Sequence, residues 1–395
     1  MTIPTYHAGQ TVRIYSPGNT LLHGKECFIH HPCLGGDYFV HTLTDGKPDG
    51  GYAYLPESEL RGSVYLSPGI DHQCTRVVFF GNGEFALPTL RWLWHSGYDI
   101  RAVVTAPDKP KGRGHKTIAN PVKRFALSNG IDVLQPNDLK DPEFLGMFRG
   151  YRPHVSVIVE FRIVPEVVIN VPQWGMLNLH SSLLPQYRGA STISAAIRNG
   201  ECQTGVTTFL LDAGIDTGNI VNNLAVPIGE NDTAGDIFVK LADCGSQMVA
   251  SALDLISNGY RGVEQKEFVN TFHLPSYAPK ISREDCEVRW NKPMAEVHDF
   301  IRAYTPKPGA WTKVWFCANN EEVVVKIHKT RKTFLPRDLK APGEWIARDG
   351  RIYICCADRL LEILELQLPG KAKVTAKDFY NGFRKLPVGF CRLRY

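Results

Sequence analysis

The sequence predicts an α/β protein in which a parallel sheet stands between two small β-barrels, and three observations lead to this prediction. Short strand-like segments broken by Gly, Pro and Asn fill the first part of the chain. From Arg76 to about Gly262 apolar runs alternate with amphipathic stretches, and strand-like segments return near the C-terminus. With 395 residues, 43% of them hydrophobic, the chain can bury two or three such cores.

The first barrel is predicted over residues 1–72. Its strand-like segments are QTVRIYS, GKECFIHH, DYFVHTL and GYAYLPESEL. Turn-forming residues separate them, which is typical of an SH3-like fold. His30, His31 and Cys33 lie close together in this region, but their spacing matches no standard metal site, so we predict surface histidines and no bound metal.

Residues 75–262 are predicted to form a Rossmann-like domain. Strand-like runs such as RVVFFG, IRAVVTA, HVSVIVE and GMLNLH alternate with helix-like stretches such as FALPTLRWLWHSG and NPVKRFALSNG. This order predicts βαβ units and a parallel sheet whose ligands bind at the carboxyl ends of the strands. Residues 263–281, which include TFHLPSYAPK, show no helical periodicity and are predicted to be a linker.

Residues 282–395 are predicted to form the second barrel. VHDFIRAY has the pattern of a short amphipathic helix, and strand-like alternation appears in WTKVWFCA, EEVVVKIHK, RIYICCA and LLEILELQL. Residues 281–395 hold 22 Lys and Arg against 14 Asp and Glu, so the positive charge of the chain is concentrated there. This excess favours a phosphate-bearing partner over a merely solvated basic surface only modestly.

Several classes of protein are excluded. The first residues lack a basic start followed by an apolar core, and no apolar run approaches the roughly 18 residues of a membrane span. The ten cysteines contain no C-x-x-C pair, which argues against a zinc ribbon or a disulfide framework. We therefore expect a cytoplasmic protein with reduced thiols and no membrane partner.

The turn after the first strand of the sheet has the pattern Gly81-x-Gly83-x-x-Ala86, which fits a relaxed dinucleotide fingerprint. A nicotinamide-dependent oxidoreductase would also need an acidic residue at the end of the second strand, but that strand ends in Thr105. Such an enzyme is a distant alternative. A tight turn without a bound nucleotide explains the glycines equally well.

The loop PDKPKGRGHKTIANP follows the second strand and is strongly basic. Its charged residues are Lys109, Lys111, Arg113, His115 and Lys116. Loops of this kind can reach phosphate groups, and glycine lets the backbone come close. A mobile surface loop with no ligand is the alternative.

The stretch NLHSSLLPQYRG carries a polar pair at the end of an apolar run. In an extended strand Asn178 and His180 project to one face, while Leu177 and Leu179 project to the other. An imidazole can exchange a proton near pH 7, and a carboxamide can donate to an oxygen that becomes negative in a tetrahedral transition state. For this pair alone, a structural histidine satisfied by backbone carbonyls is the alternative.

A carboxylate joins the pair from LLDAGIDTGNI, where Asp216 lies between Gly214 and Gly218. An Asp near a His fixes its tautomer and can help collect a proton from an attacking amine. The chain lacks the G-x-S-x-G context of a serine nucleophile. Asn178, His180 and Asp216 therefore predict direct acyl transfer to an amine, and a non-catalytic RNA-binding or scaffold protein would not explain their combination.

From Arg76 to the C-terminus the sequence resembles the folate-dependent formyltransferases, most closely their methionyl-tRNA branch. The stretches that carry the resemblance are VVFFGNGEFALPTL, APDKPKGRGHKTIANPVK, VIVEFRIVPEVV, LNLHSSLLPQYRGA, TGVTTFLLDAGIDTGNI, RWNKPMAEVHDFIRAYTPKPGAW and LQLPGKAKVTAKDF. The N-x-H-x-S-L-L-P motif followed by D-T-G is the most specific of these.

The resemblance implies 10-formyltetrahydrofolate as the formyl donor. It implies that Asn178 stabilises the oxyanion, that His180 is the acid/base group and that Asp216 sets the histidine and assists amine deprotonation. The expected folate contacts are Ser182, Leu183, Leu184, Pro185, Phe161 and Gly214. The loop residues expected at the tRNA acceptor end are Lys109, Lys111, Arg113 and Lys116. The basic C-terminal part resembles the OB-like, RNA-contacting domain of the family.

Three departures from the family pattern bear on the acceptor. RGAST places Ser191 and Thr192 where R-G-A-A-P is usual, and Glu160 stands where a small residue is usual. Residues 1–72 lie outside the usual architecture, and their acidic balance favours a protein or peptide partner over RNA. We therefore predict formyl transfer to a primary amine, that of methionyl-tRNA being favoured, with an amino sugar, amino acid or carrier-bound peptide as the alternative acceptor.

Overall fold

The computed structural model describes residues 74–108, 119–269, 274–316, 321–337, 339–348 and 350–383, and the backbone of short strands within residues 10–67 and 110–117. Its contacts divide the chain into two compact units. The first comprises Met1–Arg188, Gly205–Ala225 and Lys240–Ser276, and the second comprises Gly189–Thr204, Val226–Val239 and Tyr277–Tyr395.

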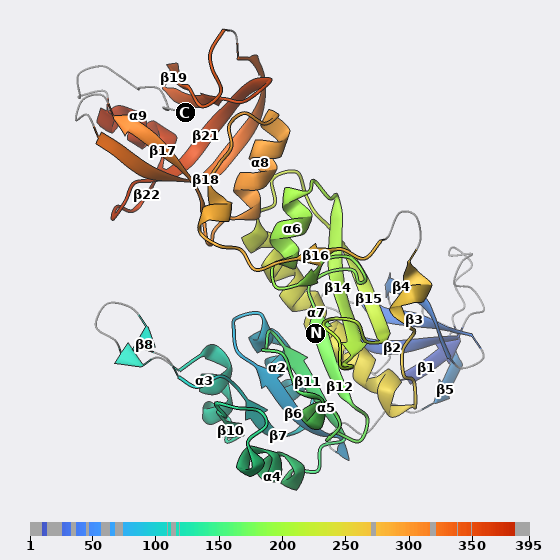
Figure 1. The fold of residues 1–395 in the computed structure, drawn as a ribbon. Helices are drawn as coiled ribbons and strands as arrows, with labels where there is room; N and C mark the ends of the chain where they lie inside the picture. The colour runs from blue at the N-terminus through green and yellow to red at the C-terminus, as the bar shows by residue number, and fades with distance from the viewer. Residues whose placement is uncertain are drawn as a thin grey trace. The chain divides into compact units, whose positions relative to one another are not determined.

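The N-terminal part contains a five-stranded antiparallel sheet, drawn in blue in Figure 1. The strands are β1 (Gln10–Arg13), β2 (Glu26–Pro32), β3 (Asp37–Thr44), β4 (Lys47–Pro56) and β5 (Val64–Ser67), in the order β4-β3-β2-β1-β5. The predicted run of β segments is confirmed. Its assignment as an SH3-like barrel stays a prediction.

The first unit is built around a seven-stranded sheet in the order β10-β7-β6-β11-β12-β14-β15. Its strands are β6 (Arg76–Gly81), β7 (Asp99–Val104), β10 (Asp132–Leu134), β11 (Val155–Val159), β12 (Met176–His180), β14 (Gln203–Leu210) and β15 (Ile220–Pro227). The first five strands of this order are parallel, as predicted. All five residues of β11 are buried, because strands at the centre of a parallel sheet are covered on both faces.

The prediction of a parallel sheet is wrong at β14, which pairs antiparallel with β12. In that pairing Leu177 lies opposite Leu210, and His180 lies opposite Thr207. The sequence conceals the reversal because β14 is buried along most of its length, as a parallel strand would be.

Helices pack on this sheet and fix which residues of β12 project to each face (Figure 1). The helices of the first part of the sheet are α2 (Ala86–His95), α3 (Pro121–Ser128), α4 (Pro142–Gly150) and α5 (Glu166–Ile169), and the long helix α7 (Ala234–Ser257) follows β15. Met176 belongs to the core formed by α4 and α5. Leu179 faces α7, where a Cβ at Gly245 would lie 2.8 Å from it. Asn178 and His180 therefore project to the face opposite Leu179, as predicted.

Local signals explain where the helices begin. Asn120 caps α3 by accepting a hydrogen bond from the Lys123 amide at 2.9 Å, and Asp141 caps α4 through the Glu143 amide at 2.9 Å. Both helices have proline in their first turn, where a missing N–H costs nothing.

The second unit contains an antiparallel β domain. Its strands are β17 (Ala310–Phe316), β18 (Glu321–Pro336), β19 (Trp345–Arg348), β20 (Arg351–Cys355), β21 (Arg359–Gln367) and β22 (Lys373–Thr375), in the order β17-β18-β21-β20-β19 with β22 beside β21. Helices α6 (Thr192–Arg198), α8 (Met294–Ala303) and α9 (Ala376–Phe383) belong to the same unit. The predicted helix and four predicted strands are confirmed, whereas the OB-like assignment stays a prediction.

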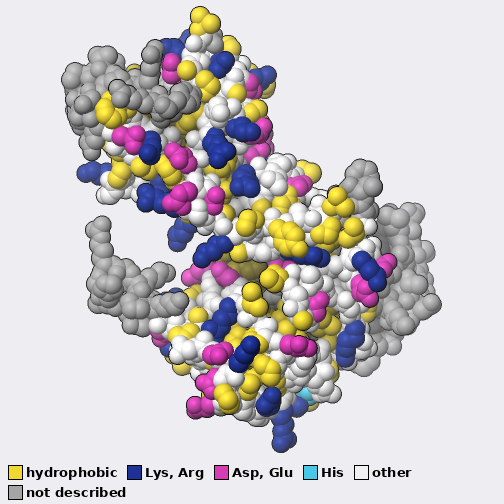
Figure 2. All heavy atoms as spheres, viewed as in Figure 1, with side chains coloured by type: hydrophobic (Ala, Val, Ile, Leu, Met, Phe, Trp, Pro, Cys, Tyr) yellow, Lys and Arg dark blue, Asp and Glu magenta, His cyan; other side chains and the backbone are white. Residues whose placement is uncertain are grey.

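The basic charge of this β domain is partly neutralised by acidic neighbours. Lys313 pairs with Glu322 at 3.2 Å, and Lys373 pairs with Glu365 at 2.6 Å. Figure 2 shows Lys and Arg side chains interspersed with Asp and Glu on its visible face. Among the described residues on that face, basic and acidic side chains are therefore mixed and not gathered in one uniform patch.

The segment after α7 contains short structured pieces. They are the 3-10 helix η2 (Gln265–Phe268), strand β16 (Tyr277–Ala278), which pairs with β13 (Arg188–Gly189), and the 3-10 helix η3 (Glu284–Cys286). None of the described helices is long and apolar enough to cross a membrane. Within the described residues no three His, Cys, Asp or Glu side chains gather where they could hold a metal ion.

Candidate active site

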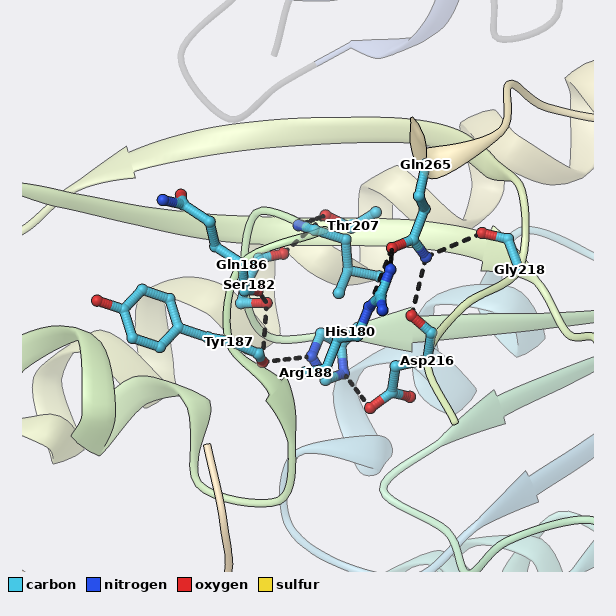
Figure 3. Close-up of polar contacts among 10 residues, drawn as sticks. His180, Ser182, Gln186, Tyr187, Arg188, Thr207, Asp216, Gly218 and Gln265 are labelled. Atoms are coloured by element: carbon cyan, nitrogen blue, oxygen red, sulfur yellow. Dashed lines mark hydrogen bonds and ion pairs between the residues drawn. The ribbon is translucent and has the colours of Figure 1, made fainter. Parts of the chain in front are cut away.

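The order of the strands in the central sheet reverses at β6, since β7 and β10 lie on one side of it and β11 and β12 on the other. Ligands of α/β proteins bind in the crevice outside the carboxyl ends of strands at such a switch point. His180 is the last residue of β12 and stands at this edge. Figure 3 shows the polar residues that surround it.

His180 lies between two hydrogen-bond acceptors. Its Nε2 is 3.0 Å from the backbone carbonyl oxygen of Tyr187, and its Nδ1 is 3.9 Å from Oδ2 of Asp216. A carbonyl oxygen can only accept, so Nε2 carries a proton and the neutral ring has its lone pair on Nδ1. The side chain of His180 is only 8% exposed, which keeps this arrangement largely away from bulk water.

The two ring nitrogens of His180 have different roles. An imidazolium donates from both nitrogens, and both of its neighbours are acceptors. The distance of 3.9 Å is too long for a hydrogen bond, but it is short enough for attraction between an imidazolium and a carboxylate. Nδ1 is therefore the nitrogen that can take up and release a proton in this site.

Asn178 projects from β12 on the same side as His180 and is half-buried. No described residue forms a hydrogen bond with its side chain. A half-buried carboxamide without such a partner can donate to a ligand oxygen, and the donation is strongest when that oxygen becomes negative.

The loop from Ser182 to Tyr187 is held by its own hydrogen bonds. The Ser182 hydroxyl donates to the carbonyl oxygen of Gln186 at 2.7 Å, and the Thr207 hydroxyl donates to the carbonyl oxygen of Ser182 at 2.7 Å. Thr207 also accepts from the amide of Leu184 at 3.1 Å. The side chain of Ser182 is fully buried, so it shapes the loop instead of facing the crevice.

The remaining predicted folate residues divide between this loop and the end of β11. Leu183 is half-buried, whereas Leu184 and Pro185 are buried, and Leu184 packs in a small core with Phe209 and Ile220, so Leu183 is the only one of the three that is partly open. Phe161 follows β11 and packs edge-on against Phe80 with ring centroids 5.5 Å apart. These groups are placed to form apolar walls near β12.

Asp216 reaches His180 because its turn folds back along β12. β14 runs antiparallel to β12, so the chain leaves it beside Met176, whose carbonyl oxygen accepts from the amide of Leu211 at 2.9 Å. The carboxylate of Asp216 nevertheless lies beside His180, at the other end of β12. The turn of residues 211–219 therefore covers the face from which Asn178 and His180 project.

This turn is tightly built, and we call it the aspartate turn. Asp212 accepts hydrogen bonds from the amide of Gly214 at 3.0 Å and from the hydroxyl of Thr217 at 2.7 Å. A Cβ at Gly218 would collide with the carbonyl oxygen of Leu210, so only glycine allows this approach. Asp216 itself has a φ of 52°, in the left-handed region that costs a non-glycine residue about 1 kcal/mol.

Gln265 and Ser276, which the sequence did not single out, hold both sides of this site. Gln265 donates from Nε2 to the carbonyl oxygens of Asp216 at 2.8 Å and Gly218 at 3.0 Å. The hydroxyl of Ser276 accepts from the amide of Tyr187 at 2.9 Å. A lone Gln or Ser in a segment without periodicity carries no signal, so only the structure could reveal them.

The turn after β6 is closed by the protein itself. Asn82 donates to the carbonyl oxygen of Glu160 at 3.2 Å, and its own oxygen accepts from the amide of Ala106 at 2.7 Å and from the Thr105 hydroxyl at 3.1 Å. A Cβ at Gly81 would lie 2.6 Å from the ring of Phe79, so close packing accounts for this glycine. These contacts explain the pattern without a dinucleotide.

Glu160 fills the space beside Gly83. A Cβ at Gly83 would run into the Glu160 carboxylate, and this carboxylate is bonded to the Phe85 amide at the start of α2. Although much of the residue is exposed, its carboxylate lies among protein atoms, and this desolvation raises its pKa above the ordinary value, with Glu84 adding to the effect. Glu160 has a φ of 53° and is also left-handed.

Comparisons with known proteins identify the family of this chain. Residues 75–253 match the family described as Formyl transferase, and residues 280–384 match the Formyl transferase C-terminal domain. The methionyl-tRNA formyltransferase of Porphyromonas gingivalis is 40% identical over 314 residues, which cover 78% of this chain and 95% of that relative. The chain belongs to the formyl transferase family.

Solved structures share the fold. The N-formyltransferase from Helicobacter canadensis, solved with folinic acid and dTDP-3-aminofucose, has a TM-score of 0.52 at 22% identity and covers 73% of this chain and 98% of that one. HypX from Aquifex aeolicus, solved with tetrahydrofolic acid, has a TM-score of 0.53 at 20% identity and covers 80% of this chain and 48% of that one. This formyltransferase thus has the Rossmann-like α/β domain of the family, which uses a folate-derived formyl donor.

The side chains of the basic loop lie outside the part of the chain that the structure describes. They include those predicted to contact tRNA, which are Lys109, Lys111, Arg113 and Lys116. The backbone forms β8 (Pro110–Lys111) and β9 (Lys116–Thr117), which pair antiparallel. At the base of the loop the Lys123 ammonium bonds to Asp108 at 2.5 Å, which lowers the pKa of that carboxyl.

The substituted RGAST motif of this formyltransferase leads into α6. Thr192 is the first residue of that helix and is buried, and Ser191 donates from its amide to the carbonyl oxygen of Ala278 at 3.2 Å. Gly214 is exposed at the outside of the aspartate turn, where a Cβ would meet the Thr217 hydroxyl.

Proposed function

We propose that this formyltransferase transfers the formyl group of 10-formyltetrahydrofolate to the amino group of methionyl-tRNA. The observation that carries the proposal is the meeting of Asn178, His180 and Asp216 on one face of β12, with a carboxamide donor beside a His–Asp pair. Direct acyl transfer needs such groups and needs no nucleophile from the enzyme.

Asn178 and His180 act on the oxyanion. When the amine attacks the formyl carbon, the carbonyl oxygen becomes negative and accepts hydrogen bonds from the Asn178 carboxamide and from protonated Nδ1 of His180. The Tyr187 carbonyl keeps Nε2 protonated throughout, so neither the tautomer nor the orientation of the ring changes during turnover. An Asn donor of this kind contributes about 10²–10³-fold to the rate.

Asp216 handles the proton of the attacking amine. A new N–C bond forms as the amine attacks, and the amine then loses a proton to the Asp216 carboxylate, directly or through a water molecule. The C–N bond to the donor breaks, and the donor nitrogen takes up a proton that His180 can supply from Nδ1. The carboxylate faces Nδ1 at 3.9 Å, so the two groups can exchange the proton through such a water molecule and return to their starting states.

The residues present fit a folate donor. A pterin ring needs apolar walls and a few polar groups, and the half-buried Phe161 and Leu183 offer the former near β12. Leu184, which is buried, is a further proposed contact. We assign Ser182 and Thr207 to shaping this loop, since their hydroxyls are already engaged within it. Pro185 and Gly214 complete the set of proposed folate contacts.

The choice of methionyl-tRNA rests on the C-terminal domain and the basic loop. The match to the Porphyromonas gingivalis methionyl-tRNA formyltransferase extends over 95% of that relative's length. Lys109, Lys111, Arg113 and Lys116 are proposed to approach the acceptor end. Residues 1–72 are proposed to form an accessory domain that binds a protein or peptide partner. The proposed catalytic domain is residues 75–262, which a linker of residues 263–281 joins to the C-terminal domain of residues 282–395.

The test measures formyl transfer from 10-formyltetrahydrofolate to charged initiator tRNA. The full chain is compared with a shorter chain that begins at Gln73, and a dTDP-linked amino sugar serves as the competing acceptor. Rapid transfer to tRNA by both chains is expected. Transfer to the amino sugar alone would replace the proposed acceptor, and transfer by the full chain alone would make residues 1–72 part of acceptor recognition.

A further inference from the structure

Gln265 bridges two parts of the first unit that are far apart in the sequence. It is only 4% exposed, and its two amide hydrogens are directed to the carbonyl oxygens of Asp216 and Gly218 (Figure 3). The two acceptors lie on either side of Thr217. Gln265 therefore holds the aspartate turn by its backbone carbonyls and makes no bond to the carboxylate of Asp216.

Arg188 determines which way the amide of Gln265 points. Its Nε and NH2 groups donate to Oε1 of Gln265 at 3.2 Å and 2.6 Å. A guanidinium has no acceptor, so the oxygen of Gln265 must face Arg188 and the NH2 group must face the two carbonyls. The hydrogen-bonding pattern is complete in this orientation alone.

Asp216 needs this support because its backbone is strained. Its φ of 52° is uncommon for a residue with a side chain. The two hydrogen bonds from Gln265 act on the carbonyl of Asp216 and on that of Gly218, which limits rotation of the peptide units that follow these two residues. A left-handed residue persists when its surroundings over-determine it, and such residues gather at functional sites.

We propose that Gln265 is a positioning residue that keeps Asp216 beside His180 during formyl transfer. This inference rests on the proposed roles of His180 and Asp216. Without the two hydrogen bonds the aspartate turn relaxes toward ordinary backbone angles, and the Asp216 carboxylate leaves the proton path. The chemical step slows while binding of the formyl donor changes little.

The first test compares Gln265→Met and Gln265→Glu in the full chain. Methionine keeps the length of the side chain but donates nothing. Glutamate keeps an acceptor for Arg188 and presents oxygen to the two carbonyls. We expect both variants to lose about ten- to a hundredfold in kcat, as misplacement of a catalytic group by about 1 Å does, with KM for the formyl donor within about threefold of the parent.

The control is Gln173→Met. Gln173 is exposed and lies before the amino end of β12, so this variant makes the same chemical change away from the site, and it should match the parent. If Gln265→Glu retained full kcat, contact with Arg188 alone would explain Gln265, and the proposal would be wrong. Full kcat in Gln265→Met would overturn it equally.

A second measurement separates positioning from a general loss of folding. Gln265→Met is combined with Asp216→Asn, and the residual rates are measured at high enzyme concentration. If Gln265 acts through the Asp216 carboxylate, it should change the rate less than about threefold once that carboxylate is absent. A loss as large as in the parent background would indicate damage to the fold and would contradict the proposal.

The Asp216→Asn variant also separates this inference from the proposed function. Near-parental kcat in Asp216→Asn would sink the proposed roles of the catalytic residues. A large loss in Asp216→Asn together with full activity in both Gln265 variants would leave those roles intact and remove only the role of Gln265.

Discussion

Two asparagines of the central sheet and its turns show how differently one side chain can be used. Asn82, in the turn after β6, donates one hydrogen bond and accepts two, and thereby ties together the ends of β6, β7 and β11. Asn178, within β12, has no side-chain hydrogen bond to any described residue. Both are half-buried. A buried polar group that the protein satisfies stabilises the fold, and one that it leaves for a ligand serves the reaction.

The largest effect is expected at the group that moves protons. His180→Ala should lower kcat about 10²–10⁴-fold, because general acid–base catalysis is lost while the surrounding loop is still held by Ser182 and Thr207. The rate of formyl transfer under saturating substrates measures it. His95→Ala, at an exposed position of α2, is the matched control, and near-parental turnover in His180→Ala would refute the mechanism.

The different roles of the two asparagines can be tested directly by substitution. Asn178→Ala should lower kcat about 10²–10³-fold with little change in stability. Asn82→Ala should lower the free energy of unfolding by about 1–3 kcal/mol, since Ala106 and Thr105 lose their partner. Urea titration and turnover are measured for both variants. If Asn82→Ala lost turnover and Asn178→Ala lost stability, the hydrogen-bonded Asn82 would be the functional asparagine.

The packing in the turn after β6 can be tested through Gly83. Gly83→Ala should lower the free energy of unfolding by about 0.5–1.5 kcal/mol, because the new Cβ displaces the end of the Glu160 side chain from its bond to the Phe85 amide. Removing that carboxylate in the double variant Gly83→Ala/Glu160→Ala should recover part of the loss. The coupling is read from urea titrations of the two single variants and the double variant, and strict additivity would mean that the two residues do not compete for space.

The smallest effect concerns the charge of Glu160. Its pKa lies above the ordinary 4.5 in the folded protein, so the folded state binds this proton more tightly than the unfolded state does. Its ionisation therefore costs stability, which is lost as the pH rises from about 4.5 through the raised pKa. Glu160→Gln should raise the Tm at about pH 7, and the gain should vanish below about pH 4. A gain that persisted in acid would point to packing instead of charge.

Local patterns were enough to predict the strands and the faces of β12. The alternation in GMLNLH placed Asn178 and His180 opposite Leu179, and the contact of Leu179 with Gly245 agrees. Apolar alternation also located α8 and four strands of the C-terminal domain. These features depend on neighbours a few residues apart, which is the range over which periodicity carries information.

The rest depends on contacts between distant segments. The antiparallel course of β14 decides that the aspartate turn folds back along β12, and burial on both faces hides that direction in the sequence. Gln265 meets carbonyls nearly fifty residues earlier in the chain, and backbone groups carry no sequence signal at all. The fit between Gly83 and Glu160 likewise requires two strand ends to be brought together first.

The contacts of Gln265 and Ser276 also bear on how parts of this protein could be exchanged with those of its relatives. A chimera joined at residue 262, the boundary predicted from the sequence, would contain Asn178, His180 and Asp216 but would take the supports of Asp216 and Tyr187 from the other parent. The catalytic residues of the chimera and the residues that hold them would then come from different parent proteins. The segment that must be transferred together with the catalytic residues therefore extends through Ser276, fourteen residues beyond that boundary.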